Sequence, residues 1–307
     1  MINLEGLGEW AGLGGADLST ARVVLAGIPY DGSAVYRKGA AAAPAAMRRL
    51  SPVIPPVDER GRSLSRATVH DLGDLDLGDS VEALWGAAAD RLAEVPPDRF
   101  LTVLGGDHCA AIPVLAAQAR RHPGLALLWI DAHPDLCDFS RGGPWTCGCA
   151  LRRGLRVAGL SPGSVAMAGC RDFDPEEVAY IAAERIAMVT SADLASDFGA
   201  AVDTVLKPLS GRPVHVSLDI DVLDPAYAPG TEIACAGGLT TRQVLDLLAA
   251  TARVATLVGL DVCEVSPPLD HTDVTSLAAL KLIFETWGLA VGAGGPASAS
   301  NRLAGPG

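Results

Sequence analysis

The sequence predicts an α/β protein, with three α/β/α layers built on a mainly parallel sheet. Short apolar runs of strand length alternate with longer segments of helical pattern, and this alternation favours parallel strands covered by helices on both faces. A hydrophobic share of 49% supports a large buried interior. Clusters of Asp and His directly follow three of the apolar runs. In such sheets the site lies beyond the carboxyl ends of the strands.

The first half of the chain alternates apolar runs with helical segments. Each run is rich in Val, Ile, Leu or Ala and ends at a turn-forming or polar residue, which is typical of a strand. Strands are predicted at residues 21–29, 69–76, 101–104 and 126–130. Helices are predicted at residues 44–49, 81–95 and 108–121, the first of them entered at a proline.

The second half repeats the alternation after an irregular stretch. Helices are predicted at residues 147–153, 175–184, 191–207, 240–252 and 272–291, and Thr240 caps the fourth of them. Strands are predicted at residues 164–169, 185–189 and 256–262, and another begins at 214–216 and leads into an Asp-rich segment. No internal repeat is apparent.

The chain divides into three parts. Residues 1–20 are rich in glycine and lack periodicity, so they are expected to form an N-terminal extension packed on the surface or on a neighbouring subunit. Residues 21–291 are expected to form one catalytic domain, a size that single α/β units often reach. Residues 292–307 are rich in Gly, Pro, Ala and Ser and are expected to be a flexible tail.

Charge and cysteine usage limit the partners and the compartment. A net charge of -12 argues against nucleic acid or an anionic membrane as partner. The charge is compatible with a cationic substrate, although soluble enzymes are often mildly acidic. The seven cysteines have no framework-like spacing, and neither a signal peptide nor a membrane span is visible. The expected location is therefore the cytoplasm.

Metal-ligand residue types recur at the ends of three predicted strands. In the segment 217–225, an extended chain would place Asp219 and Asp221 on one face, because alternate side chains of a strand point the same way. Two neighbouring carboxylates repel each other, so a cation is expected between them.

The same pattern occurs upstream. Asp131, His133 and Asp135 follow the apolar run 126–130 at steps of two, and His108 follows Gly105-Gly106-Asp107. The two glycines would let the backbone pass close to a bound group.

Together these clusters supply four carboxylates and two imidazoles. Six ligands exceed what one ion usually takes from a protein, so a pair of bridged ions fits better. Oxygen-rich ligation with one histidine per ion suits Mn²⁺, while nickel, cobalt and zinc stay possible. Two such ions lower the pKa of a bridging water from about 15.7 toward neutrality. The expected reaction class is metal-assisted hydrolysis.

Four segments of the chain resemble the signature segments of the ureohydrolases, the arginase and agmatinase family. They are residues 105–108, 131–135, 217–225 and 261–267, in the family's order, and residues 27–31 add to the likeness. The resemblance covers about residues 22–290. It implies an arginase-like three-layer fold, a dinuclear manganese centre, hydrolysis of a guanidinium group to urea and an amine, and a homotrimer or homohexamer.

The resemblance also implies roles for single residues. One ion would be held by His108, Asp131, Asp135 and Asp219, and the other by Asp131, His133, Asp219 and Asp221. Glu264 matches the carboxylate that receives the guanidinium and so is a substrate-binding and catalytic candidate. A planar fork of N–H donors pairs bidentately with such a carboxylate.

Segments that bear on the substrate give mixed signals. Residues 230–240 and 266–271 resemble agmatinase-type members, whereas Arg171-Asp172-Phe173-Asp174-Pro175 resembles the arginase segment that faces the substrate's amino group. Asp172 and Asp174 could therefore anchor a cationic tail, or Asp174 could cap a helix. Arg141 is a candidate for holding a carboxylate instead.

The clearest departure from the family concerns proton transfer. Most ureohydrolases have a His-Gly pair at the position of Cys147-Gly148, and this chain has no histidine between His133 and His215. Cys147 is either a catalytic substitute that carries protons, if its pKa is suitable, or a residue that only lines the pocket.

Three functional hypotheses follow. The first is a manganese amidinohydrolase that cleaves a small, agmatine-like guanidino compound by attack of a metal-bridging hydroxide. The second is a formiminoglutamase-like or other amidine hydrolase, which the missing histidine favours. The third is a metal-binding pseudoenzyme that keeps the fold without turnover.

Overall fold

The computed structural model describes residues 8–75, 81–140 and 143–292, and the side chains of residues 81–84 are left out. Within these ranges eight parallel strands form one sheet in the order β2-β1-β3-β8-β7-β4-β5-β6. The strands are β1 (Val23–Ile28), β2 (Val69–Asp74), β3 (Phe100–Gly105), β4 (Ala126–Ile130), β5 (Val165–Cys170), β6 (Ala187–Thr190), β7 (Pro213–Asp219) and β8 (Thr256–Cys263).

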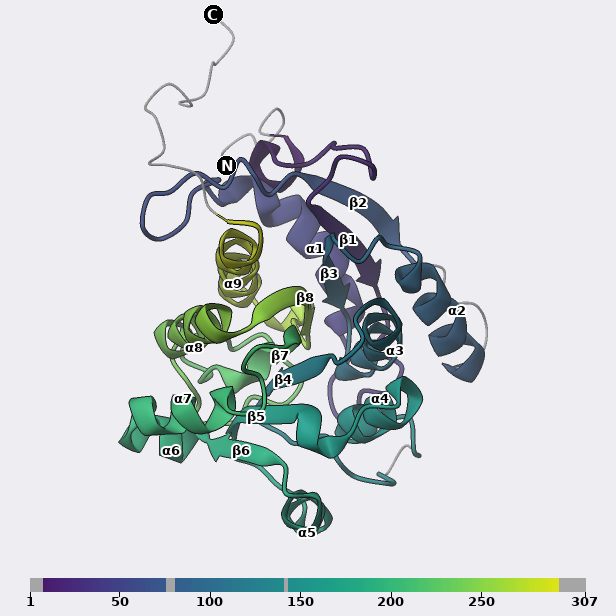
Figure 1. The fold of residues 1–307 in the computed structure, drawn as a ribbon, viewed down its shortest axis with the longest axis vertical. Helices are drawn as coiled ribbons and strands as arrows, with labels where there is room; N and C mark the ends of the chain where they lie inside the picture. The colour runs from purple at the N-terminus through teal and green to yellow at the C-terminus, as the bar shows by residue number, and fades with distance from the viewer. Residues whose placement is uncertain (1–7, 76–80, 141–142, 293–307) are drawn as a thin grey trace, which may run out of the picture.

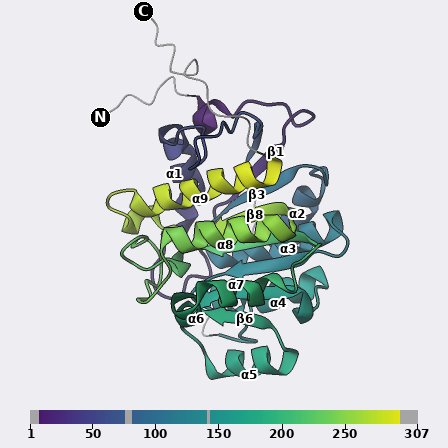
Figure 2. The ribbon, with the colours of Figure 1, turned by 60° about the vertical axis from the view of Figure 1, so that its left-hand side comes forward.

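Helices cover both faces of this sheet, which confirms the predicted three layers (Figures 1 and 2). One face carries α1 (Ala43–Leu50), α6 (Ser191–Ser196), α7 (Phe198–Leu206), α8 (Thr241–Val254) and α9 (Val274–Val291). The other carries α2 (Val81–Ala93), α3 (Ala111–Arg121), α4 (Ala150–Ala158) and α5 (Pro175–Glu184). Short 3₁₀ helices, η1 to η8, cover Glu9–Gly12, Ala40–Ala42, Ser51–Val53, His108–Ala110, Cys147–Cys149, Pro162–Ser164, Ile220–Val222 and Pro267–Leu269.

The central strands are buried on both faces. Every residue of β3 and β4 is buried, as expected for parallel strands between two helical layers. Helix α9 is long and apolar enough to cross a membrane by composition alone, but 61% of it is buried inside the fold. Its Phe284 and Trp287 belong to the core beside the sheet, so its hydrophobicity is explained by packing.

Residues 8–20 pack onto the body of the same chain. Trp10 is buried and meets Trp287 edge-on at a ring-centroid distance of 5.6 Å. Its indole nitrogen donates to Asp71, at 3.2 Å. The amide of Ala16 donates to the carbonyl of Val69 at the start of β2. The predicted tail, by contrast, lies outside the described residues from residue 293 onward.

Two predicted elements differ from the structure. The single helix expected at residues 191–207 is two helices, α6 and α7, because Asp197 leaves the helical conformation and its carboxylate caps the amide of Ala200. The strand expected to run through the Asp-rich segment ends at Asp219, and residues 220–222 form a 3₁₀ turn. The predicted alternation of Asp219 and Asp221 on one strand face is therefore wrong.

The role predicted for the Gly105-Gly106 turn also changes. A Cβ on Gly106 would lie 1.9 Å from the carbonyl oxygen of Tyr30, and one on Gly105 would lie 2.5 Å from the Cys263 sulfur. The amide of Asp107 donates to the same Tyr30 carbonyl at 2.7 Å. The glycines thus allow neighbouring segments of the chain itself to approach, rather than a bound group.

Candidate metal centre and substrate cavity

The predicted site residues lie at the carboxyl ends of five neighbouring strands, β3, β8, β7, β4 and β5. Because parallel strands end at the same edge of the sheet, residues far apart in sequence meet there. In sheet order the strands contribute His108, Glu264, Asp219 with Asp221, then Asp131 with His133 and Asp135, and finally Asp172 with Asp174.

Three carboxylates surround the ring of His108. Its Nδ1 atom lies 2.9 Å from Asp131 Oδ2, 3.2 Å from Asp219 Oδ2 and 3.3 Å from Asp135 Oδ2. All four residues are buried. The four residues that the family resemblance assigns to one ion therefore converge on one point.

A second group forms around His133. Its Nδ1 lies 3.0 Å from Asp221 Oδ2 and 3.6 Å from Asp131 Oδ1. Asp131 thus turns one carboxylate oxygen to each histidine. Such a shared carboxylate is what a pair of bridged cations requires.

Glu264 Oε2, next to this cluster, is buried and has no hydrogen-bond partner among the described residues. Unpaired buried polar atoms are costly, so they call for a ligand. The donor set of carboxylate oxygens and neutral imidazoles fits divalent cations, with oxygen-preferring and borderline metals favoured.

The backbone holds the carboxylates by short local hydrogen bonds. The amide of Asp221 donates to Asp219 Oδ1 at 2.8 Å, and the amide of His133 donates to Asp131 Oδ1 at 2.7 Å. The amide of Ala132 donates across to Asp221 Oδ1 at 3.1 Å. These turns, rather than strand alternation, bring the acids of the two segments together.

A buried hydrogen-bonded chain orients His108 from behind. Its Nε2 lies 3.0 Å from Ser217 Oγ, which donates to Asp261 Oδ1 at 2.7 Å. The other oxygen of Asp261 lies 2.6 Å from His215 Nε2. The His108 ring also stacks on Trp129, with centroids 4.0 Å apart. With Nε2 hydrogen-bonded to this chain, Nδ1 is left to face the carboxylates.

Crowding shifts the pKa values of the acids in opposite directions. Burial, with Asp221 and Asp131 nearby, raises the pKa of Asp219 well above its usual range. Burial and the charge of Asp131 raise the pKa of Asp135 to about 7. Burial also acts on Asp131, but the two adjacent histidines outweigh it and lower its pKa. These shifts arise without bound cations, which would favour the charged form of every carboxylate.

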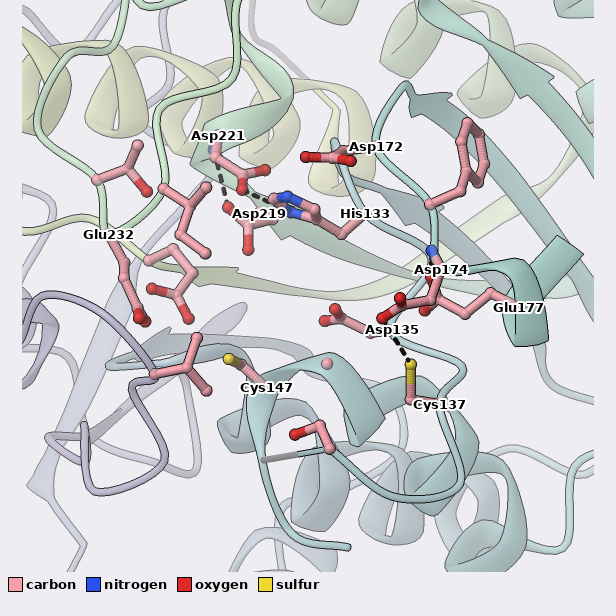
Figure 3. A pocket seen from close by; sticks show the side chains of 17 residues that line it. His133, Asp135, Cys137, Cys147, Asp172, Asp174, Glu177, Asp219, Asp221 and Glu232 are labelled. Atoms are coloured by element: carbon pink, nitrogen blue, oxygen red, sulfur yellow. Dashed lines mark hydrogen bonds and ion pairs between the residues drawn. The ribbon is translucent and has the colours of Figure 1, made fainter. Parts of the chain in front are cut away.

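A cavity of about 330 Å³ opens onto these groups (Figure 3). Beside the metal-ligand candidates it is lined by Val35, Cys137, Ser140, Cys147, Gly148, Asp172, Phe173, Asp174, Glu177, Thr231, Glu232, Ile233 and Glu264. None of the lining residues that the structure describes is a lysine or an arginine. The volume suits a small molecule, and the charge of the lining suits a cation.

Glu264 lies at what we call the inner end of the cavity, together with Glu232 and the metal-ligand candidates. One Glu264 oxygen accepts the amide of His108 at 2.9 Å, and the other has no partner. The backbone of Glu264 is left-handed, with a φ of 63°, and that of Asp135 has a φ of 54°. This conformation is uncommon for residues other than glycine, and it clusters at functional sites.

Asp172 and Asp174 lie at the outer end of the cavity, where both are exposed. Asp174 is also the N-cap residue of α5, and its amide donates to Glu177 Oε2 at 2.9 Å. Both alternatives considered for Asp174 are therefore compatible with its position. Arg141 lies outside the described residues, so its predicted contact with a carboxylate stays a prediction.

Cys147 lines the inner end, and its role as proton carrier stays a prediction. Burial and the carboxylates of Glu264 and Asp135 raise the pKa of its thiol well above the ordinary value. A thiol that stays protonated at neutral pH is a poor proton acceptor.

Glu232 was not among the predicted site residues. It stands in the loop 230–240, whose resemblance to agmatinases does not single out its one acid. The structure buries it to 4% exposure and places it on the cavity wall. An isolated acid between Thr231 and Ile233 was the only local signal.

Hydrolases that act on C–N bonds in amidines share this parallel α/β fold, and the comparisons place the chain in that class. Residues 21–288 match the model of the Arginase family, and the chain belongs to that family. It is 35% identical to an agmatinase of Bacillus cereus, over 86% of this chain and 90% of the relative. It is 34% identical to the proclavaminate amidinohydrolase of Streptomyces clavuligerus, over 85% of each chain.

Solved structures agree with the family assignment. The proclavaminate amidinohydrolase structure superposes with a TM-score of 0.81 at 32% identity, covering 88% of this chain and 92% of the other. A native arginase from Bacillus caldovelox gives 0.76 at 28% identity, covering 87% and 98%. The predicted arginase-like fold is therefore confirmed.

Proposed function

We propose that this chain hydrolyses a small guanidino compound with a second cationic end, agmatine-like, to urea and an amine. The cavity supports this proposal most directly. It joins the His and Asp cluster to a wall rich in carboxylates, without lysine or arginine among its described residues. An anionic tail would find no counterion among the described residues of that wall, whereas an ammonium group would.

The metal centre would be divided between two sets of ligands. His108, Asp131, Asp135 and Asp219 would hold one divalent ion, and Asp131, His133, Asp219 and Asp221 the other. When bound, two such ions make water a competent nucleophile at neutral pH. Manganese is the proposed metal because the ligands are mostly carboxylate oxygens, with one imidazole for each ion.

Glu264 would receive the guanidinium. Its Oε2 is buried and without a partner, and the amide of His108 fixes its other oxygen. A guanidinium donates two parallel N–H bonds to such a carboxylate, which fixes both its position and its plane. Orientation of this kind reduces the entropy lost when the reacting groups meet.

The outer acids would hold the tail. Figure 3 shows Asp172 and Asp174 beyond His133 and Asp135 as seen from Glu232, which clusters with Glu264, so a short chain could reach them from the guanidinium. Because both are exposed, we expect them to select among tails rather than to supply most of the affinity.

A formimino hydrolase is the second candidate, favoured by the absence of a histidine at residue 147. The formimino derivative of glutamate carries two carboxylates. The acidic wall of the cavity opposes binding of such an anion, so we rank this candidate below the first.

A product assay on Mn²⁺-loaded protein tests the proposal. Agmatine, 4-guanidinobutyrate and formiminoglutamate are supplied in parallel, and urea, formamide and ammonia are measured. We expect urea from agmatine, and much less from 4-guanidinobutyrate, whose tail is anionic. Formamide from formiminoglutamate would favour the second candidate. With both metal sites filled, absence of any product would support a pseudoenzyme.

We also propose a cytoplasmic location and a trimeric or hexameric assembly. All seven cysteines are free, which supports a reducing compartment. Light scattering coupled to gel filtration measures the mass of the assembly directly, and a monomer would contradict the assembly proposal.

A further inference from the structure

We propose that Glu232 is a specificity-determining residue that brackets the substrate's guanidinium together with Glu264. This inference rests on the proposed function and adds a second carboxylate to guanidinium recognition. Cys147, Glu232 and Glu264 each direct one side-chain atom to a common point, and these atoms lie within 4.8 Å of one another. All three residues line the cavity, and Figure 3 shows Cys147 and Glu232 at its inner end.

An independent observation indicates that a ligand belongs there. Glu264 is 5% exposed, and its Oε2 has no hydrogen-bond partner. A buried carboxylate oxygen without a partner, close to a second carboxylate, is doubly unfavourable unless a cationic donor lies between them. The pair is therefore arranged for a cation.

Glu232 is held too firmly to swing away from its neighbour. Its Oε1 accepts the amide of Tyr36 at 2.5 Å. Its main-chain carbonyl accepts two bonds from the guanidinium of Arg37, at 2.7 and 3.0 Å, and Arg37 also reaches the carbonyl of Thr231 at 3.2 Å. Glu232 is held at its main-chain carbonyl and at one carboxylate oxygen, so its distance from Glu264 is set by the fold.

A guanidinium matches this pair better than a simple ammonium does. Its N–H donors lie in one plane and point along different edges, so two carboxylates can each accept from a separate edge. With the guanidinium between Glu232 and Glu264, the substrate tail can extend toward the outer end of the cavity. The same arrangement would bind a neutral urea analogue poorly, because the two acids would stay uncompensated.

The competing reading is that Glu232 only anchors the loop 35–37. Glu232→Gln distinguishes the two, because glutamine keeps an oxygen that accepts the amide of Tyr36 while it loses the charge. Arg37→Met is the matched control, since it removes the anchor on the main chain of residue 232 and leaves the carboxylate. Unfolding temperatures of all variants check that each is folded.

The test measures binding and not turnover, so it can be read even if urea release fails. N-butylguanidine and its neutral isostere N-butylurea are titrated by calorimetry into Mn²⁺-loaded wild type, Glu232→Gln and Arg37→Met. We expect the preference for the cation to fall about tenfold in Glu232→Gln, because one charge-assisted hydrogen bond is weakened. It should stay near the wild-type value in Arg37→Met. Glu232→Asp, which keeps the charge but shortens the reach, should give an intermediate preference.

Three outcomes would overturn the inference. One is an unchanged preference for the cation in Glu232→Gln. Another is an equal loss of both ligands in Glu232→Gln and Arg37→Met, which would assign Glu232 to loop anchoring. The third is a bound-metal content of three ions in wild type that falls to two in Glu232→Gln, which would make this cluster a metal site. Absence of urea release together with an intact preference for butylguanidine would reject the proposed reaction alone.

Discussion

The two ends of the cavity both carry aspartates, but those at the inner end are buried and those at the outer end are exposed. At the inner end, Asp219 and Asp221 line the cavity with Asp131 next to them; all three are buried, and each accepts a backbone amide. At the outer end, Asp172 and Asp174 are exposed. A buried, fixed charge interacts strongly with a cation, whereas an exposed one is screened by water and salt. Chemistry is therefore expected to depend on the inner end, and choice of tail on the outer end.

The largest effect should come from the carboxylate shared by both histidine groups. Asp131→Asn removes a charged oxygen from each group, so we expect loss of metal and a fall in urea release of at least about a thousandfold, equivalent to several kcal/mol. Metal content by mass spectrometry and initial rates check this. Full metal content with normal turnover would refute the assignment of the shared ligand.

The hydrogen-bonded chain behind His108 should have the next largest effect. Ser217→Ala removes the hydroxyl between His108 and Asp261, and the loss of such supporting contacts typically weakens metal affinity by about 10- to 100-fold. Titration of metal-free protein with Mn²⁺ measures the change. Ser217→Cys, which is similar in size and keeps a weak donor, is the control. Equal affinity in all three proteins would show that this chain does not position the ring.

Substitutions at the outer end should have a small effect on KM, and only for substrates with a charged tail. Asp172→Asn should raise the KM for agmatine by no more than about fivefold, since exposed ion pairs contribute about 1 kcal/mol or less. Little change is expected for butylguanidine binding, because that ligand lacks the second amine. A comparable loss with both ligands would place Asp172 at the guanidinium instead.

Asp174 needs a different substitution because it also begins α5. Asp174→Ser keeps a capping oxygen and removes the charge, whereas Asp174→Ala removes both. If its charge serves the tail, the two variants should share the same rise in KM, and only Asp174→Ala should lose stability, by about 1 kcal/mol. Normal KM values in both variants would exclude a role in binding the substrate tail, and Asp174 would then only cap α5.

A histidine far from the cavity should give the smallest effect, seen only in stability. Burial and the neighbouring Arg121 lower the pKa of His122 to about 4 from 6.5. The unfolded chain therefore takes up this proton first, so stability is lost as pH falls from about 6.5 toward 4. His122→Gln should flatten this part of a melting-temperature profile without altering urea release at neutral pH. An unchanged slope would mean that other groups control acid stability.

Local sequence patterns predicted the features that depend on neighbouring residues, namely the strands and a helix cap. Apolar runs placed every strand of the described sheet to within a few residues, and the Thr240 cap was found as predicted, donating and accepting in a reciprocal pair with Gln243. The metal-ligand candidates could be proposed from the sequence too, because each lies at or just beyond a strand end, and the structure brings them together. Such signals need only neighbouring residues.

What the sequence did not reveal depends on contacts between distant segments. Glu232 is fixed by Tyr36, 196 positions away, and no spacing rule connects them. The turn at Gly106 is set by Tyr30, and the hydrogen-bonded chain behind His108 joins residues more than a hundred positions apart. Tertiary packing determines these features, so local pattern could not indicate them.

The left-handed backbones of Asp135 and Glu264 imply a trade-off between durability and activity. Glycine adopts that conformation freely, so a glycine at either position would relax the turn and also delete a buried acid of the metal and substrate cluster. Such a protein should melt later and yet do no chemistry. Substitutions that raise the melting temperature should therefore be made on the outer helices. Replacing Asp135 or Glu264 with glycine would stabilise the turn but remove catalytic activity.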